Sequence, residues 1–126
     1  MDKWQSLHAF WNSFGLVAYD ELTTFTKGQL PAFPHITYQS FGGRMGQVAT
    51  LSASLWYKED TWANIKRKAD EILKYMTDRE PLSIKIDNGF LWLKVPEYTP
   101  FAQPMGSEDD TKRIVLTIEA ESLTNF

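Results

Sequence analysis

Residues 61–76 read TWANIKRKADEILKYM, and the rest of the chain is organised around them. At about 100° per residue, the apolar side chains fall within one arc of about 100°, and charged side chains fill the remaining surface. Burying the large apolar side chains contributes on the order of 10 kcal/mol, because each is worth about 1.5–3 kcal/mol. The pattern therefore predicts a helix held in place by packing on a sheet, through Trp62, Ile65, Ala69, Ile72, Leu73 and Met76.

The same stretch makes three finer predictions. Asp60 or Thr61 is expected to accept hydrogen bonds from the free N–H groups at the helix start. Lys68 lies away from the apolar arc, so Lys68→Ala is expected to be nearly silent. Opposite charges at i,i+4 spacing predict ion pairs worth about 0.2–0.5 kcal/mol each: Lys66–Asp70, Arg67–Glu71 and Asp70–Lys74.

Length and composition indicate one globular domain, residues 1–126, with 43% hydrophobic and 23% charged residues. The net charge of −3 weighs against a nucleic-acid-binding protein with a broad basic face. Cysteine is absent, which excludes disulfides and thiolate catalysis. No apolar run approaches the ~20 residues of a membrane span. The first ten residues lack the apolar core of a signal peptide, so we expect synthesis and folding in the cytoplasm.

A second amphipathic pattern lies at the N-terminus, where apolar residues recur within an arc of about 120°. It predicts a helix over residues 2–14, with Asp2 as its cap and Gly15 ending it in the left-handed conformation. The apolar stripe is mostly aromatic, so it is either a core face or, alternatively, a patch that faces a partner. Its residues are Trp4, Leu7, Phe10, Trp11 and Phe14.

Alternation of apolar and polar residues predicts the strands. Residues 35–41 and 47–57 alternate on either side of the glycine-containing turn 42–46, and should form an antiparallel hairpin. Asp87-Asn88-Gly89 is a strong hairpin signal between residues 82–86 and 90–95. A short strand at 16–20, a loop at 21–34 and a closing strand at 112–123 complete the chain. We therefore expect an α+β fold, a mostly antiparallel sheet of four to five strands with two helices packed on one face.

Residues 96–111 show no periodicity, contain three prolines, and are predicted to form one long extended loop. We expect this loop to be ordered mainly by neighbouring molecules, through an oligomer or partner interface at Tyr98, Phe101, Gln103 and Met105. It ends in the acidic run Glu108-Asp109-Asp110, which is either a solvated loop or a charged surface facing a partner or a channel.

No pattern in the chain predicts catalytic chemistry. His8 and His35 are its two histidines, and neither has metal-ligand or triad spacing around it. The glycine-rich residues 42–46 lack the Lys-Ser/Thr of a phosphate-binding loop. We therefore expect no catalytic, metal-binding or cofactor-binding residue, no cofactor, and a protein that is not an enzyme.

Aromatic and turn motifs recur along most of the chain. The most distinctive is Pro100-Phe101-Ala102-Gln103-Pro104-Met105-Gly106, with acidic residues and a C-terminal strand after it. The others are Trp4, Phe10-Trp11, Phe14-Gly15, Ala18-Tyr19-Asp20-Glu21, Pro34-His35-Ile36-Thr37-Tyr38 and Ser54-Leu55-Trp56-Tyr57. Together these motifs resemble those of the tail terminator or tail completion proteins, small proteins of long-tailed (siphovirus-type) phages. Val17, Gly28 and residues 22–33 do not match the family pattern.

The resemblance implies a virion structural protein located at the head–tail junction. Its partners would be other copies of itself in a ring, commonly of six subunits, the tail tube protein and the head-completion protein. DNA would only pass through the lumen, and no membrane partner is implied. We expect Glu108, Asp109 and Asp110 to face this lumen, because a wall of like charge would not hold the DNA. Strand edges that could pair with neighbours fit a ring, and a monomer is compatible with it when the protein is isolated. The alternatives are another head–tail adaptor, such as a head-completion or baseplate protein, or a non-phage small-molecule-binding domain.

Overall fold

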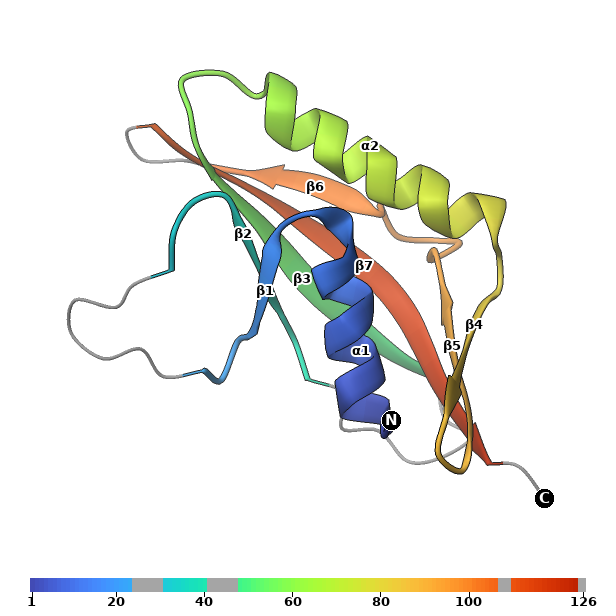
Figure 1. Cartoon of the computed structure of the whole chain (residues 1–126). Coiled ribbons are helices and arrows are strands. Elements are labelled where there is room, and N and C mark those ends of the chain that lie inside the picture. Colours follow the sequence, from blue (N-terminus) through green and yellow to red (C-terminus); the bar gives the residue numbers. More distant parts are fainter. Residues whose placement is uncertain (24–30, 41–47, 107–109, 125–126) are drawn as a thin grey trace.

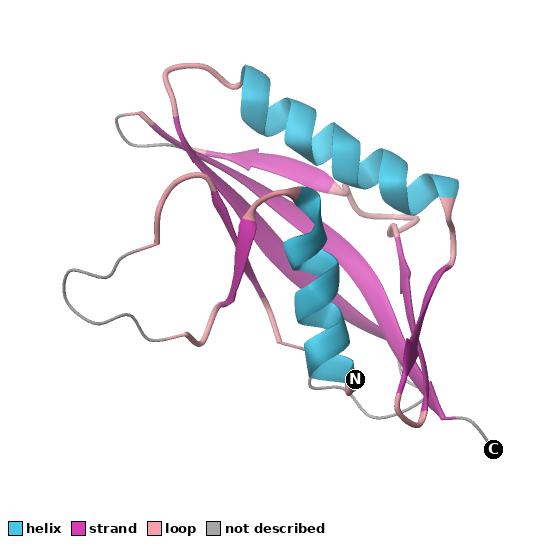
Figure 2. Ribbon diagram, in the orientation of Figure 1, coloured by secondary structure: helices cyan, strands magenta, loops and turns pink. Residues whose placement is uncertain are grey.

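The computed structural model describes residues 1–23, 31–40, 48–106 and 110–124, and confirms the α+β fold (Figure 1). Helix α1 spans Lys3–Trp11 and continues as a 3₁₀ turn, η1, over Asn12–Phe14. Helix α2 spans Ala63–Asp78. Both helices lie on the same face of a curled sheet, as predicted (Figure 2).

The described strands form one mixed sheet in the order β1-β2-β3-β7-β5-β4, with β6 also paired to β7. The sheet curls so far that β1 and β4, at its opposite ends, both contact α1, while α2 contacts β3, β5 and β7. The strands are β1 Val17–Asp20, β2 His35–Tyr38, β3 Val48–Lys58, β4 Leu82–Ile86, β5 Gly89–Lys94, β6 Ala102–Met105 and β7 Thr111–Thr124.

The sheet differs from the expected four to five strands in two details. The described part of the chain contributes seven strands, and β1 runs parallel to β2, with Val17 opposite His35. The antiparallel strand pairs of both predicted hairpins are confirmed, since Trp56 lies opposite His35 and Gly89 opposite Ile86. The predicted turn at residues 42–46 lies outside the described residues. A parallel pair needs a long connection rather than a tight turn, so no local turn signal marks it.

Residues 96–111 are not one extended loop, because β6 lies within them. β5 and β6 both pair with the same side of β7, at Lys94–Glu119 and at Ala102–Leu116. β5 and β6 therefore form one strand along β7 that residues 95–101 interrupt. These residues bulge out of the sheet, and only residues 117 and 118 of β7 lie opposite them. The sequence pattern did not predict β6, because its residues show no alternation and include Pro104, which has no N–H to donate.

The helix ends follow the predicted signals at α1 but not at α2. The Asp2 carboxylate accepts from the Gln5 amide at 2.8 Å, and Gly15 has φ 82°. Trp62 precedes α2 and no side chain caps it, so the expected cap from Asp60 or Thr61 is wrong. Tertiary packing holds this helix end without a cap, through the half-buried ring of Trp62.

The core lies between the two helices and the inner face of the sheet. Ile65, Ala69, Ile72 and Met76 of α2 are buried, whereas Trp62 and Leu73 are only partly buried. The α1 stripe divides in the same way, because Trp4 is exposed and its other members are buried. The buried residues of the stripe are Leu7, Phe10, Trp11 and Phe14.

Lys68 joins the two helices instead of pointing into open solvent. Its Nζ donates to the Phe14 carbonyl at 2.8 Å and pairs with Glu71 at 3.2 Å. In the described part of the chain α2 forms the ion pairs Lys68–Glu71 and Lys74–Asp78, and not the three expected at i,i+4. Neither described helix is long and apolar enough to cross a membrane.

Candidate functional site

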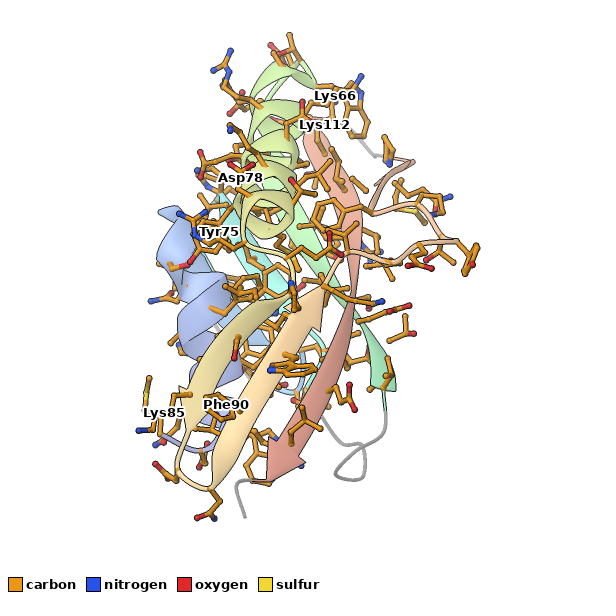
Figure 3. All side chains as sticks on the ribbon, turned by 90° about the vertical axis from the view of Figure 1, so that its right-hand side faces the viewer. Lys66, Tyr75, Asp78, Lys85, Phe90 and Lys112 are labelled. Atoms are coloured by element: carbon orange, nitrogen blue, oxygen red, sulfur yellow. The ribbon has the colours of Figure 1, made fainter. Side chains whose placement is uncertain are left out.

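The sheet has an outer face that the two helices leave uncovered. Figure 3 views the sheet across β4 and β5 and shows both helices on one side of β7. Because side chains alternate along a strand, the neighbours of the buried residues point to this outer face. In β3, for example, Leu55 and Tyr57 are buried under the helices, and Trp56 between them faces outward.

Two rows of outer-face side chains cross the sheet from β1 to β6. Residues opposite one another in paired strands lie on the same face, so the register defines each row. The first row is Val17, His35, Trp56, Arg113 and Met105. The second row is Tyr19, Thr37, Ser54, Val115 and Gln103.

An aromatic cluster is formed by three residues of these rows, Tyr19, His35 and Trp56, together with Phe33, which lies just before β2. The His35 ring centroid lies 5.9 Å from that of Tyr19 and 5.0 Å from that of Phe33. It also stacks on Trp56 at 6.3 Å with an interplanar angle of 16°. Ring pairs at such separations stabilise by about 0.5–1.5 kcal/mol beyond area burial.

Polar groups of the same two rows fix the indole in place. Trp56 Nε1 donates to Thr37 Oγ1 at 2.9 Å. The Arg113 guanidinium lies 4.8 Å from the Trp56 ring centre, and its Nε donates to Ser54 Oγ at 3.1 Å. The cluster is therefore a rigid surface of aromatic rings with a guanidinium on top, the composition that protein interfaces favour.

His35 is the buried centre of the cluster, with 5% of its surface exposed. Its Nδ1 lies 3.1 Å from the Ala32 carbonyl, so a protonated Nδ1 donates to that oxygen. Burial lowers the pKa of His35, and the bond to Ala32 raises it by less. The imidazole is therefore neutral near pH 7, which lets it stack among apolar rings without a charge to solvate.

The predicted interface residues of the 96–111 segment separate into three groups. Gln103 and Met105 lie at the β6 end of the two rows and are exposed. Tyr98 is 94% exposed on the bulge formed by residues 95–101. Phe101 is 7% exposed and belongs to the core of its own chain, so it is not offered to a partner.

The acidic run is only partly described. Glu108 and Asp109 lie outside the described residues, so their expected place in a lumen has no structural account. Asp110 is half-buried, and its carbonyl accepts from the Glu59 amide at 2.8 Å. The backbone at Asp110 is thus tied to the end of β3.

Sequence reasoning did not assign a role to Tyr19, His35, Trp56 or Arg113. One signal was available, because Trp56 alternates with Leu55 and Tyr57 and so falls on the polar side of its strand beside Ser52 and Ser54. A large aromatic residue on a polar face is a candidate for an interface, because Trp is enriched in protein interfaces. Arg113 carried no comparable signal, because only the pairing of β3 with β7 brings it to Trp56.

The edge of β1 does not offer the free backbone groups that the sequence suggested. Residues 17, 19 and 21 face β2, as the Glu21 N–H bond to the Tyr38 carbonyl shows, so Ala18 and Asp20 face outward. The Ala18 N–H already donates to Asn12 Oδ1 at 3.1 Å. The Asp20 carbonyl accepts from the Thr23 amide at 2.9 Å. Little of this edge remains for another strand.

The other two edges are similarly short of free groups. Thr117 N–H bonds to the Phe101 carbonyl, and by alternation the outward positions of β6 are Ala102 and Pro104, the second without an N–H. On β4 the register places Ser83 and Lys85 at the outward positions. Beyond them the Asp87 N–H donates to the Met1 carbonyl. A charged residue and a proline are common protections against edge pairing. The outer face, and not an edge, is therefore the better surface for a partner.

No metal site adds to this surface, because the described residues contain no group of three or more His, Asp or Glu side chains that could hold an ion. The comparisons with known proteins return no matching family model and no matching curated protein.

Proposed function

We propose that the protein is a structural subunit of a phage tail, a tail terminator that forms a ring at the end of the tail tube and joins it to the head. Its partners in this role are further copies of the chain, the tail tube protein and the head-completion protein. The ring is commonly of six subunits, and the role is structural, not enzymatic.

One observation carries the proposal. Three motifs of the resemblance, residues 18–21, 34–38 and 54–57, contribute Tyr19, His35 and Trp56 to the aromatic cluster. A further motif, residues 100–106, brings Gln103 and Met105 to the far end of the same rows. Motifs that are distant in sequence thus meet on one helix-free surface, which is what a shared binding surface requires.

The physical character of this surface suits contact with another protein. Val17 is 56% exposed at one end of the first row and Met105 is 39% exposed at the other, with Trp56 and Arg113 between them. Trp, Tyr and Arg supply most of the binding energy in typical interfaces. A face that contacts a different surface of the next subunit gives a head-to-tail interface, which closes into a ring at a defined rotation.

The direct experiment adds the purified chain to assembled tail tubes of the phage that encodes it and images the tube ends by electron microscopy. Val17→Glu and Met105→Glu place a charge on exposed positions of the first row, and both should abolish rings at tube ends while leaving the fold intact. Leu22→Glu is the matched control, because Leu22 is 77% exposed and lies outside the rows. Tubes capped equally by all three variants would exclude the outer face as the ring contact.

Deleting the gene tests the role itself. Loss of a terminator should give full heads without tails, together with free tails of abnormal length. Tails of normal length joined to heads in the deletion strain would rule the role out. Free tails of normal length, together with tailless heads, would favour another head–tail adaptor instead.

The acidic run keeps its proposed place in the lumen of the ring. Like charge on a channel wall prevents DNA from being held there by phosphate contacts. Changing Glu108, Asp109 and Asp110 together to Lys should leave assembly intact and slow DNA ejection. Unchanged ejection kinetics would contradict a place in the lumen and leave the acidic run as a solvated turn.

A further inference from the structure

A second feature of the outer face is a hollow of about 420 Å³ near the β4–β5 side of the sheet. We call it the Trp92 hollow. The register shows that Val48, Glu121 and Trp92 form one row across it, and Glu119 and Lys94 lie in the next. Val48, Pro81 and Trp92 supply its apolar walls.

The charges around the hollow are unbalanced. Among the described residues, Glu80, Glu119 and Glu121 line it against the single cation Lys94, so three negative charges face one positive charge there. Lys94 Nζ lies 3.6 Å from Glu119 and so partly neutralises that carboxylate. Within the described part of the chain, Glu121 forms no ion pair. The hollow therefore favours a positively charged group.

Trp92 supplies an aromatic surface for the same group. Its side chain is 41% exposed and stands directly across the ladder from Glu121. An aromatic face attracts a cation through its quadrupole, with a gain of about 0.5–1 kcal/mol at exposed sites. The indole can therefore contact the flat face of a cation, while the carboxylate beside it accepts hydrogen bonds from the N–H groups of the same cation.

The chain itself contains two examples of a guanidinium over an aromatic ring, the arrangement that a bound arginine would form at Trp92. Arg113 lies over Trp56 at 4.8 Å on the same outer face, and Arg79 lies over Tyr75 at 4.0 Å. In the described residues, Trp92 has no cation over its ring. The planar guanidinium stacks on an indole and hydrogen-bonds a carboxylate at once, which the compact lysine ammonium does less well.

We propose that the Trp92 hollow binds an arginine side chain of a partner protein, with the guanidinium over the Trp92 ring and its N–H groups donating to Glu121. The hollow continues the outer face beyond the two rows, so an arginine presented by a docked protein reaches it without any movement of the chain. The assignment is independent of the proposed role in a tail, since it requires only a partner that presents arginine.

The experiment follows the indole Nε1–H signals of the full chain by nuclear magnetic resonance, with Trp92→Phe identifying the Trp92 signal. The probes are a blocked Gly-Arg-Gly peptide and its citrulline counterpart, which has the same shape without the charge. The arginine peptide should shift the Trp92 signal saturably, with an affinity at least about fivefold above that of the citrulline peptide. The Trp56 signal should stay in place, because Arg113 already covers that ring.

Glu121→Gln should weaken arginine-peptide binding by about fivefold or more, because a charge-assisted bond becomes a neutral one. The matched control is Asp60→Asn, an exposed carboxylate that does not line the hollow, and it should bind as the unchanged protein does. Equal shifts from the arginine and citrulline peptides, or full binding by Glu121→Gln, would overturn the site. If free arginine bound more tightly than the peptide, the ligand would be a small molecule, and the proposal of a protein partner would be overturned.

Discussion

Leu55 and Trp56 are neighbours in β3 and face opposite environments. Leu55 is fully buried under the helices, with Ile36 and Ile114 across the ladders beside it. Trp56 faces outward and is half-buried by His35 and Arg113 of the adjacent strands. One face of the sheet is thus stabilised by apolar burial, and the other by directional contacts among polar and aromatic groups.

The outer face itself shows a second contrast, between Trp56 and Trp92. Trp56 has its N–H bonded to Thr37 and its ring covered by Arg113. Trp92 stays exposed beside carboxylates. The first indole is satisfied by its own chain, and the second is available to another molecule. An exposed aromatic residue is therefore informative only after its neighbours are known.

The largest expected effect is on the inner face. Ile72→Ala should lower the free energy of unfolding by about 2–5 kcal/mol, because Ile72 is fully buried and the truncation leaves a cavity. Chemical denaturation measures this change. Val17→Ala, on the exposed outer face, is the matched control and should cost less than about 0.5 kcal/mol. A loss below 1 kcal/mol for Ile72→Ala would contradict the packing of α2 on the sheet.

The next effect separates the two indoles. Trp56→Ala removes a hydrogen bond, a ring stack and a cation contact, and should cost about 2–3 kcal/mol. Trp92→Ala should cost about 1 kcal/mol or less, since its ring is open to solvent. Thermal or chemical unfolding of the two variants side by side gives the answer. Equal losses would mean that Trp92 is as deeply integrated as Trp56.

A smaller effect is expected from the contact between the helices. Lys68→Ala should cost about 1–2 kcal/mol, because the Phe14 carbonyl loses a charged donor and the side chain is largely buried. Lys66→Ala, two residues earlier and on the exposed side of the helix, should change stability by less than about 0.5 kcal/mol. This outcome replaces the expectation from the helix pattern that Lys68 is silent. If both variants unfold like the original chain, the bond to Phe14 contributes nothing.

The smallest effect is the pH dependence of the aromatic cluster. The pKa of His35 is lowered from 6.5 in the folded chain, so the unfolded chain binds a proton first as the pH falls. The contribution of His35 to stability is therefore complete above pH 6.5 and decreases as the pH falls from 6.5 to the lower folded pKa. Unfolding measured between pH 7.5 and about 5 should show this slope, and His35→Gln should flatten it. A slope that persists in His35→Gln would assign it to other groups.

Local sequence patterns were sufficient for the elements with a strong short-range signal. The apolar arc of residues 61–76, the Asp2 cap and the Asn88-Gly89 turn each act within a few residues, and the corresponding helices and hairpin are present. β6 was missed because its residues do not alternate and include Pro104, and the parallel pairing of β1 was missed because no tight turn leads to it. The candidate site was missed because it depends on pairing between strands that are distant in sequence, such as β3 and β7, although Gln103 and Met105 at its edge were named.

The sequence by itself determined the fold class, the two helices, most strands and most residues of the core, because hydrophobic periodicity shows which face of each element is buried. Only the tertiary structure decided what lies on the opposite face. Trp56 and Arg113 meet because β3 and β7 pair along their length, and Lys68 reaches Phe14 because both helices share one side of the sheet. Such contacts depend on the register and packing of the whole core, which a local pattern does not specify.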